Sequence, residues 1–159
     1  MLEWLENSAV ARLVQETIWG YPIVLSSHAV GMAILAGIVL MLNFRVLGLA
    51  PGIPLDRLKP MYRVALIGLI INVISGSMLF VSNADAFFQS TPFWIKMGLL
   101  GAGITLMLVM ARRIFDSTAN LLAPEPRAST KLIAVVSSVA WLGVIVMGRL
   151  IAYWDWKDF

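Results

Sequence analysis

Four long apolar stretches, separated by short segments that contain proline and glycine, dominate the pattern of the chain. A helix that crosses a lipid bilayer needs roughly 20 mostly apolar residues, and each stretch is long enough. The prolines that end helices lie in the connectors. No segment alternates apolar and polar residues over the length of a lipid-facing barrel strand. The pattern predicts four membrane-spanning helices at about 21–43, 61–82, 93–115 and 132–154.

The residues before the first span have a different pattern. Leu2, Leu5, Ala9 and Leu13 recur at helical spacing, with charged and amide side chains between them. Such a segment is typical of an amphipathic helix that lies in the membrane interface, here over about 2–16. The alternative is a plain leader that delivers the chain to its first span.

The composition supports a lipid environment. Of 159 residues, 60% are hydrophobic and 13% are charged, and this charged share is about half that of a soluble domain. The net charge of +3 does not indicate a nucleic-acid partner, because the charges lie at the ends of the apolar stretches. We expect an all-α integral membrane protein with one domain over 1–159. Short connectors favour an up-down-up-down four-helix bundle.

The distribution of lysine and arginine predicts the orientation. The two connectors at 44–60 and 112–131, with their flanks, carry eight of these residues, whereas the other side carries four. The more basic side is expected to be cytoplasmic, so that both termini face outside a bacterial inner membrane. Tryptophans at the opposite ends of the spans fit the same layout, since indole rings prefer the interface. These are Trp19, Trp94 and Trp154.

Small residues at four-residue spacing predict where helix backbones approach one another. Three spans carry such stripes: Ala29, Ala33 and Gly37 in the first, Gly68, Asn72 and Gly76 in the second, and Gly98 and Ala102 in the third.

Several chemistries are excluded or disfavoured by residue type. The chain has no cysteine, so disulfides, thiolate metal sites and a cysteine nucleophile are excluded. It has one histidine, which removes the usual multi-histidine metal sites within one chain. Hydrolase, Walker and zinc-protease motifs are missing. No acidic residue lies at mid-depth in a span, and we assign no enzyme class from the sequence.

Three ionisable residues within the spans are the candidates for function, because such residues are costly in a membrane. His28, Lys96 and Arg149 lie in three different spans, at roughly 12, 5 and 8 Å below the same outer edge. One histidine can serve as an axial ligand of haem iron. The two cations, nearer the surface, suit the propionates of haem b. Gly31, one helical turn from His28, would leave room for the flat macrocycle.

A sixth haem ligand is limited to methionine in this chain. Met78 or Met147 lies nearer the depth of His28, whereas Met107 and Met110 lie roughly 9 Å or more deeper. A five-coordinate iron, or a ligand from a second copy of the chain, stays an alternative.

Each of these residues also has a purely structural explanation. His28 can bond a neighbouring helix through Ser75, Ser77 or Asn72, and Lys96 and Arg149 can extend to the interface. Three functional hypotheses follow. The first is a haem-b redox or haem-handling protein that exchanges electrons with a quinone or an outer-face redox protein. The second is a cofactor-free anchor or assembly subunit of a larger complex or homo-oligomer. The third is a binder or carrier of a small anion.

Three short motifs carry a resemblance to known families. The runs "SSHAVGMAILAGIVLMLNFRVLGL", "TPFWIKMGLL" and "GRLIAY" resemble a family of small four-helix bacterial inner-membrane proteins of unknown function. More distantly, His28 on the first span and Lys96 entering the third resemble the copper-resistance protein D and haem-dependent protoporphyrinogen oxidase families. The latter has a further histidine on the third span, and this chain has only methionines, Met107 and Met110, near that position. The resemblance therefore implies the fold and a haem, but not the oxidase activity.

Overall fold

The protein is all-α in the residues that the computed structural model describes, which are 2–49, 51–115 and 126–153. Four long helices are apolar and long enough to cross a membrane, so the chain is a multi-pass membrane protein, as the sequence predicts. Residue 154, where the predicted fourth span ends, lies outside the described residues. The long helices are α3 (Gly20–Leu47), α4 (Lys59–Ser82), α6 (Thr91–Phe115) and α8 (Ala128–Leu150).

The first span is longer than the polar residues near its end suggest. The helix that contains the predicted span at about 21–43 is α3, which continues to Leu47 and ends at Gly48, whose φ of 93° only glycine adopts readily. Asn43 stays helical because its amide is bonded inside the bundle. Arg45 stays helical because its Nε donates to the Ile53 carbonyl at 2.5 Å.

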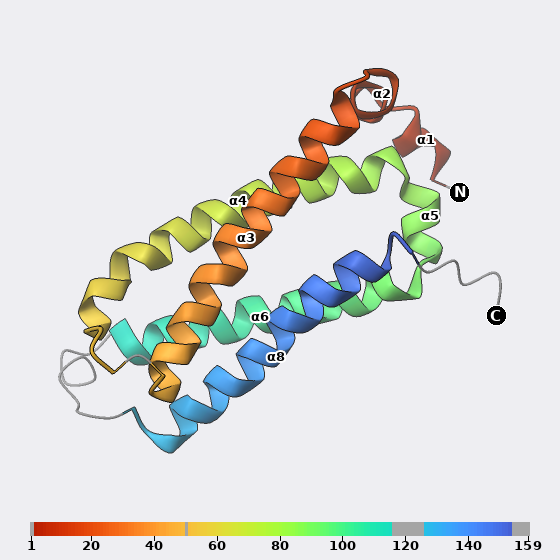
Figure 1. Cartoon of the computed structure of the whole chain (residues 1–159). Coiled ribbons are helices and arrows are strands. Elements are labelled where there is room, and N and C mark those ends of the chain that lie inside the picture. The colour runs from red at the N-terminus through yellow and green to blue at the C-terminus, as the bar shows by residue number, and fades with distance from the viewer. Residues whose placement is uncertain (1, 50, 116–125, 154–159) are drawn as a thin grey trace.

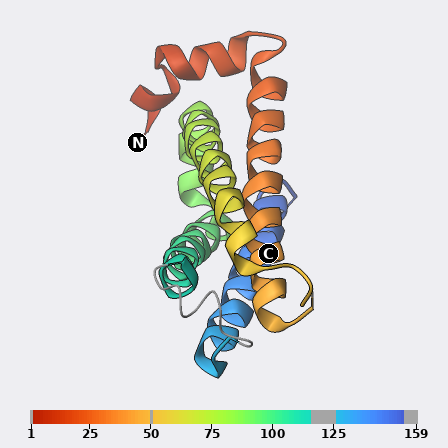
Figure 2. The same cartoon turned by 90° about the vertical axis from the view of Figure 1, so that its left-hand side faces the viewer.

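The amphipathic segment is two helices rather than the single one predicted over 2–16. These are α1 (Glu3–Glu6) and α2 (Ala9–Glu16), which lie across the end of the bundle in Figure 2. The break occurs at Ser8, whose Oγ accepts a hydrogen bond from the Ala11 amide at 3.2 Å and so begins a new helix. The buried face of α2 consists of Ala11 and Val14. α2 therefore packs on α3 and α4, with its other apolar side chains exposed.

Two short elements lie in connectors that the sequence left without structure. A 3-10 turn at Leu55–Leu58 precedes α4, and its two leucines are buried. A short helix, α5 (Ala84–Gln89), joins α4 to α6. The carboxylate of Glu6 accepts a hydrogen bond from the Asp85 amide at 3.0 Å, which ties α1 to the start of α5.

The bundle consists of two helix pairs that separate toward the N-terminal end. α3 packs against α4 and α6 against α8, and contacts between α3 and α8 join the pairs. The start of one helix contacts the end of its partner, as His28 does Ser75 and Lys96 does Gly148, so each pair is antiparallel. In Figure 1 the pairs lie together where α3 ends and apart where α3 begins. The way in which the helices cross a bilayer stays a prediction.

Glycines lie where neighbouring helices approach one another most closely. Only some of the predicted small-residue stripes take part in these contacts. A Cβ at Gly68 would lie 2.9 Å from the Gly31 carbonyl oxygen, so the α4 stripe does face α3. Gly103 of α6 faces Trp141 of α8 in the same way. Spacing alone did not reveal which face of each helix is turned inward. The stripes of Ala29, Ala33 and Gly37 and of Gly98 and Ala102 are exposed.

A buried polar cluster joins α3 to α8 in the tightly packed half. The Asn43 amide nitrogen donates to the hydroxyls of Ser137 at 3.0 Å and Ser138 at 3.2 Å. Around it lies an apolar core that includes Leu35, Val39 and the fully buried Trp141. In the described part of the chain, no side-chain hydrogen bond joins α3 to α8 in the other half of the bundle, and the helix pairs leave a cavity there.

Candidate functional site

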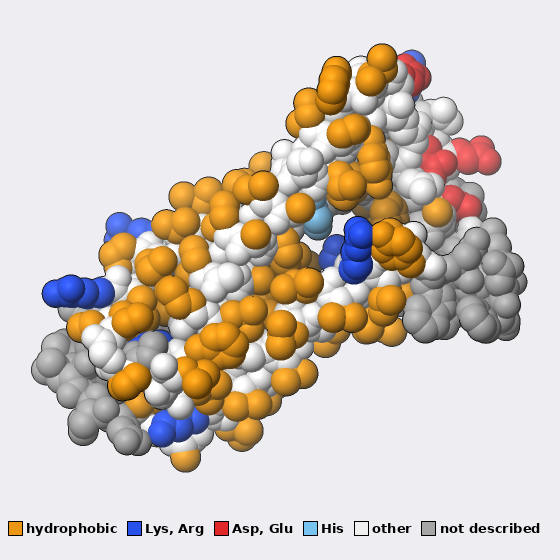
Figure 3. Space-filling model, in the orientation of Figure 1, with side chains coloured by type: hydrophobic (Ala, Val, Ile, Leu, Met, Phe, Trp, Pro, Cys, Tyr) orange, Lys and Arg blue, Asp and Glu red, His pale blue; other side chains and the backbone are white. Residues whose placement is uncertain are grey.

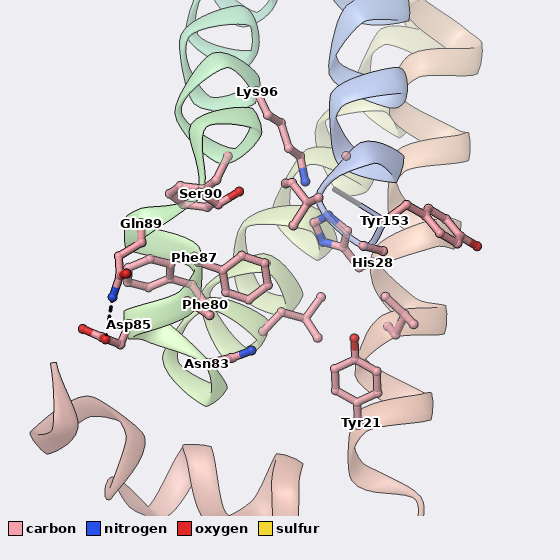
Figure 4. Close-up of a pocket in the computed structure, with 18 of the residues that line it drawn as sticks. Tyr21, His28, Phe80, Asn83, Asp85, Phe87, Gln89, Ser90, Lys96 and Tyr153 are labelled. Carbon is pink, nitrogen blue, oxygen red and sulfur yellow. Dashed lines mark hydrogen bonds between the residues drawn. The ribbon is translucent and has the colours of Figure 1, made fainter. Parts of the chain in front are cut away.

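A large cavity lies between the two helix pairs at the end of the bundle that carries the N-terminus. We call it the His28 cavity, and its volume is about 980 Å³. Its wall is formed by the start of α3, the end of α4, α5, the start of α6 and the end of α8. Figure 4 shows the labelled side chains around it. A volume of this size falls within the range of sites for small ligands and cofactors, roughly 300–1,000 Å³.

His28 projects from α3 into the cavity and is held by α4. Its Nδ1 lies 3.0 Å from the hydroxyl oxygen of Ser75. That hydroxyl lies 2.6 Å from the Ile71 carbonyl oxygen and has one proton, which we place on this bond, so that the ring proton is assigned to Nδ1 as the donor to Ser75. The neutral ring then has its lone pair on Nε2. Gly76 makes room for the ring, since a Cβ there would lie 3.1 Å from His28 Cε1.

Lys96 enters the same cavity from α6, on the opposite side. Figure 4 shows its side chain reaching toward the His28 imidazole. Gly148 of α8 leaves space for it, because a Cβ there would lie 3.5 Å from Lys96 Nζ. Among the residues that the structure describes, no hydrogen bond or ion pair is found at Nζ. The structure thus brings together two of the candidate residues, a histidine and a lysine, around one space.

Arg149 lies beside the cavity and not within it. Its side chain is exposed, Nη2 donates to the Tyr153 hydroxyl at 2.5 Å, and the guanidinium lies 4.7 Å from the centre of the Tyr153 ring. Tyr153 itself lines the cavity. Arg149 is therefore near the rim, in contact with a residue of the wall.

The remaining candidate residues lie outside the cavity wall. Gly31 faces α4, where a Cβ would lie 2.6 Å from the Asn72 amide nitrogen, so the space beside it is filled by protein. Met78 packs near Val14 and Val24. Met147 is half-buried on α8 and does not line the cavity.

An aromatic wall completes the cavity and was not anticipated. Phe80 of α4 stacks on Phe93 of α6 with centroids 5.4 Å apart, and Phe87 of α5 lies 5.7 Å from Phe93. All three line the cavity, together with Tyr21 and Tyr153. The signal available in the sequence was the aromatic pair at 87–88 in an otherwise short polar connector. The cavity thus combines an apolar aromatic wall with one imidazole, one ammonium group and, toward α1 and α5, the carboxylates of Glu6 and Asp85.

Multi-ligand metal sites are not found in the described ranges. No group of three or more His, Asp or Glu side chains is close enough there to hold a metal ion. A metal in the His28 cavity would depend on a single histidine, as haem iron can.

Comparison with known proteins identifies the family. A model described as "Family of unknown function (DUF6644)" matches residues 1–154, so the chain belongs to the DUF6644 family. This confirms the expected membership in a family of unknown function. No curated protein and no solved structure matches the chain. The resemblance to the copper-resistance protein D and protoporphyrinogen oxidase families therefore stays an expectation from the sequence.

Proposed function

We propose that this member of the DUF6644 family binds haem b in the His28 cavity, with the His28 imidazole as an axial ligand. The proposal rests on the contact between His28 Nδ1 and Ser75. This contact leaves the lone pair of Nε2 free to bind a metal in a cavity of about 980 Å³. Metal-bound histidines commonly donate their other N–H to a carboxylate, a backbone carbonyl or water, which fixes the tautomer and the ring orientation, and the Ser75 oxygen would act here as the same kind of acceptor.

The rest of the cavity wall also suits this ligand. The three phenylalanines offer an apolar surface to a flat macrocycle, and Lys96 offers a cation to a propionate. Arg149 is available to a second propionate only at the rim, since it is exposed. Among the described residues, no methionine lines the cavity, and we therefore favour one protein ligand to the iron over the pair with Met78 or Met147. A haem held in this way supplies one-electron redox chemistry.

The orientation and partners belong to the same proposal. With the connectors 44–60 and 112–131 in the cytoplasm of a bacterium, the His28 cavity lies in the outer half of the inner membrane. Its redox partner is then a quinone in the lipid or a protein at the outer face.

Because the chain has no cysteine, single-cysteine variants test this orientation without background. We expect an impermeant maleimide to label Gln89→Cys from outside intact cells, and Gly52→Cys only after the cells are opened. The reverse pattern would invert the orientation.

The experiment for the haem is a visible spectrum of the protein purified in mild detergent from a haem-sufficient host. Reduced-minus-oxidised spectra and a pyridine haemochrome assay should give about one haem b per chain, with none in His28→Ala. The matched control is Ser77→Ala, an exposed change on α4 that should keep the haem. A colourless wild-type protein, also after extraction in native lipid particles, would overturn the proposal. A colourless wild-type protein that copurifies with a second protein would favour the role of an anchor or assembly subunit.

A second candidate function is favoured by the way Lys96 reaches toward His28. The Lys96 ammonium, which reaches into the cavity, has three N–H donors and suits a compact anion or a carbonyl oxygen. Under this alternative the protein binds a small anion without a cofactor. Lys96→Gln would then abolish anion binding by a colourless protein, measured by calorimetry with acetate and phosphate as probes.

A further inference from the structure

The His28 cavity opens sideways between α3 and α8. Contacts of α3 with α8, such as Asn43 with Ser137, lie in the other half of the bundle. At the cavity, three of its lining residues are open to the surroundings: Tyr21 is 51%, Leu25 44% and Tyr153 69% exposed. Figure 3 shows the resulting hollow, with the single histidine visible inside and basic side chains beside it. The opening is therefore a gap in the wall of the bundle.

The depth of this opening places it against lipid. The centre of α3 falls between residues 33 and 34, so Leu25 and His28 lie roughly 13 and 8 Å from it along the helix. Half the hydrocarbon core of a bilayer is about 15 Å thick. Tyr21, roughly 19 Å from the centre, falls at the interface. A molecule dissolved in the membrane can thus reach the cavity without crossing water.

Two cations lie along this path at different depths. Arg149 is exposed on α8, next to the lining residue Gly148, and roughly 15 Å from the centre of its helix, at the edge of the hydrocarbon. Lys96 is half-buried inside. In the described part of the chain, the partner found for Arg149 is Tyr153, a phenol and an aromatic face. Guanidinium donors that remain free suit a carboxylate or phosphate arriving from the membrane surface.

We infer that the His28 cavity receives an acidic amphiphile directly from the lipid phase, through the opening between α3 and α8, with Arg149 as the first contact for its acidic group. This rests on the proposal that the cavity is a ligand site, and it names the class of ligand: an apolar body with a carboxylate. Lys96 then holds the acidic group inside, and the phenylalanines contact the body. Haem b and a fatty acid share this chemistry.

The test uses a diazirine-bearing stearic acid in phosphatidylcholine vesicles that contain the whole protein. After illumination, peptide mapping should locate the label on cavity-lining segments of α3, α4 and α8. The matching stearyl alcohol probe, which lacks the charge, should label these segments about threefold less. Arg149→Gln should lower labelling by the acid to a similar extent, whereas Arg63→Gln, an exposed change at the other end of the bundle, should not.

A second pair of variants tests the opening without changing a charge. Leu25→Trp fills the rim and should reduce labelling, while Ile23→Trp, exposed on α3 but not part of the wall, should leave it unchanged. Equal labelling by acid and alcohol, or insensitivity to both Arg149→Gln and Leu25→Trp, would overturn the inference. Competition by haemin separates the two proposals. Labelling that haemin does not displace would contradict the haem function while supporting entry from lipid. Haem binding without any labelling of the cavity would support the haem function and contradict entry of the ligand from lipid.

Discussion

Nδ1 of the His28 imidazole on α3 lies 3.0 Å from the hydroxyl oxygen of Ser75 on α4. This bond fixes the ring on one wall of the cavity and leaves Nε2 as the atom that can bind a metal. We assign Ser75 as the acceptor at this contact, because its one proton is placed on the bond to the Ile71 carbonyl. Position and tautomer of the histidine therefore depend on a serine one helix away.

Replacing Ser75 should weaken haem binding while the protein stays folded. Ser75→Ala removes the acceptor for Nδ1, and loss of such a partner lowers metal affinity roughly 10- to 100-fold. Titration of the apoprotein with haemin, followed by the Soret band, measures the change. Ser75→Thr keeps the hydroxyl and should keep most of the affinity. Equal affinity in Ser75→Ala and the wild type would show that this bond has no role in binding.

Lys96 should discriminate between acidic and neutral forms of the ligand. Lys96→Gln should weaken the binding of haemin by roughly tenfold, the value of a hydrogen bond to a charged group. It should hardly change the binding of haemin dimethyl ester, which lacks the carboxylates. Lys59→Gln, at the other end of the bundle, provides the control. A loss of the same size for both ligands would mean that Lys96 supports the fold and does not contact a propionate.

The contact between Gly68 and Gly31 should tolerate no added methyl group. Gly68→Ala brings a Cβ to about 2.9 Å from the Gly31 carbonyl oxygen, and backbone cannot move aside cheaply. Overpacking of this kind costs about 1–3 kcal/mol. Gly37→Ala, where no atom lies within 4 Å, should be neutral or slightly stabilising. Thermal unfolding in detergent compares the two. Equal melting temperatures would contradict the close packing of α3 on α4.

Asn43 should hold the two helix pairs together. Asn43→Leu removes both hydrogen bonds to α8, and interhelical bonds of this kind are worth roughly 0.6–1.7 kcal/mol in a membrane. Ser137→Ala should cost less, because the amide keeps Ser138. Both changes are measured by thermal unfolding. A larger effect for Ser137→Ala than for Asn43→Leu would contradict the cluster as described.

The part of the fold that the sequence predicts is the set of long helices, because these depend on the length of the apolar runs. All four long helices follow from runs of roughly 20 apolar residues, and His28 and Lys96 were found because ionisable groups are costly in spans. The cavity itself was not predictable. It depends on how far the two helix pairs separate, and the side-chain hydrogen bonds printed between α3 and α8, those of Asn43 with Ser137 and Ser138, lie in the other half of the bundle. The sequence places Gly31 one helical turn from His28 and so suggests space for a haem macrocycle beside it. It does not show that α4 fills this space.

Native mass spectrometry of the protein released from lipid nanodiscs tests the central claim most directly, because it weighs whatever the His28 cavity holds. The wild type and the Ser77→Ala control should each carry one haem b per chain, and His28→Ala should lose it. A wild-type chain that carries no haem, or a His28→Ala variant that keeps it, would contradict the assignment of His28 as its ligand.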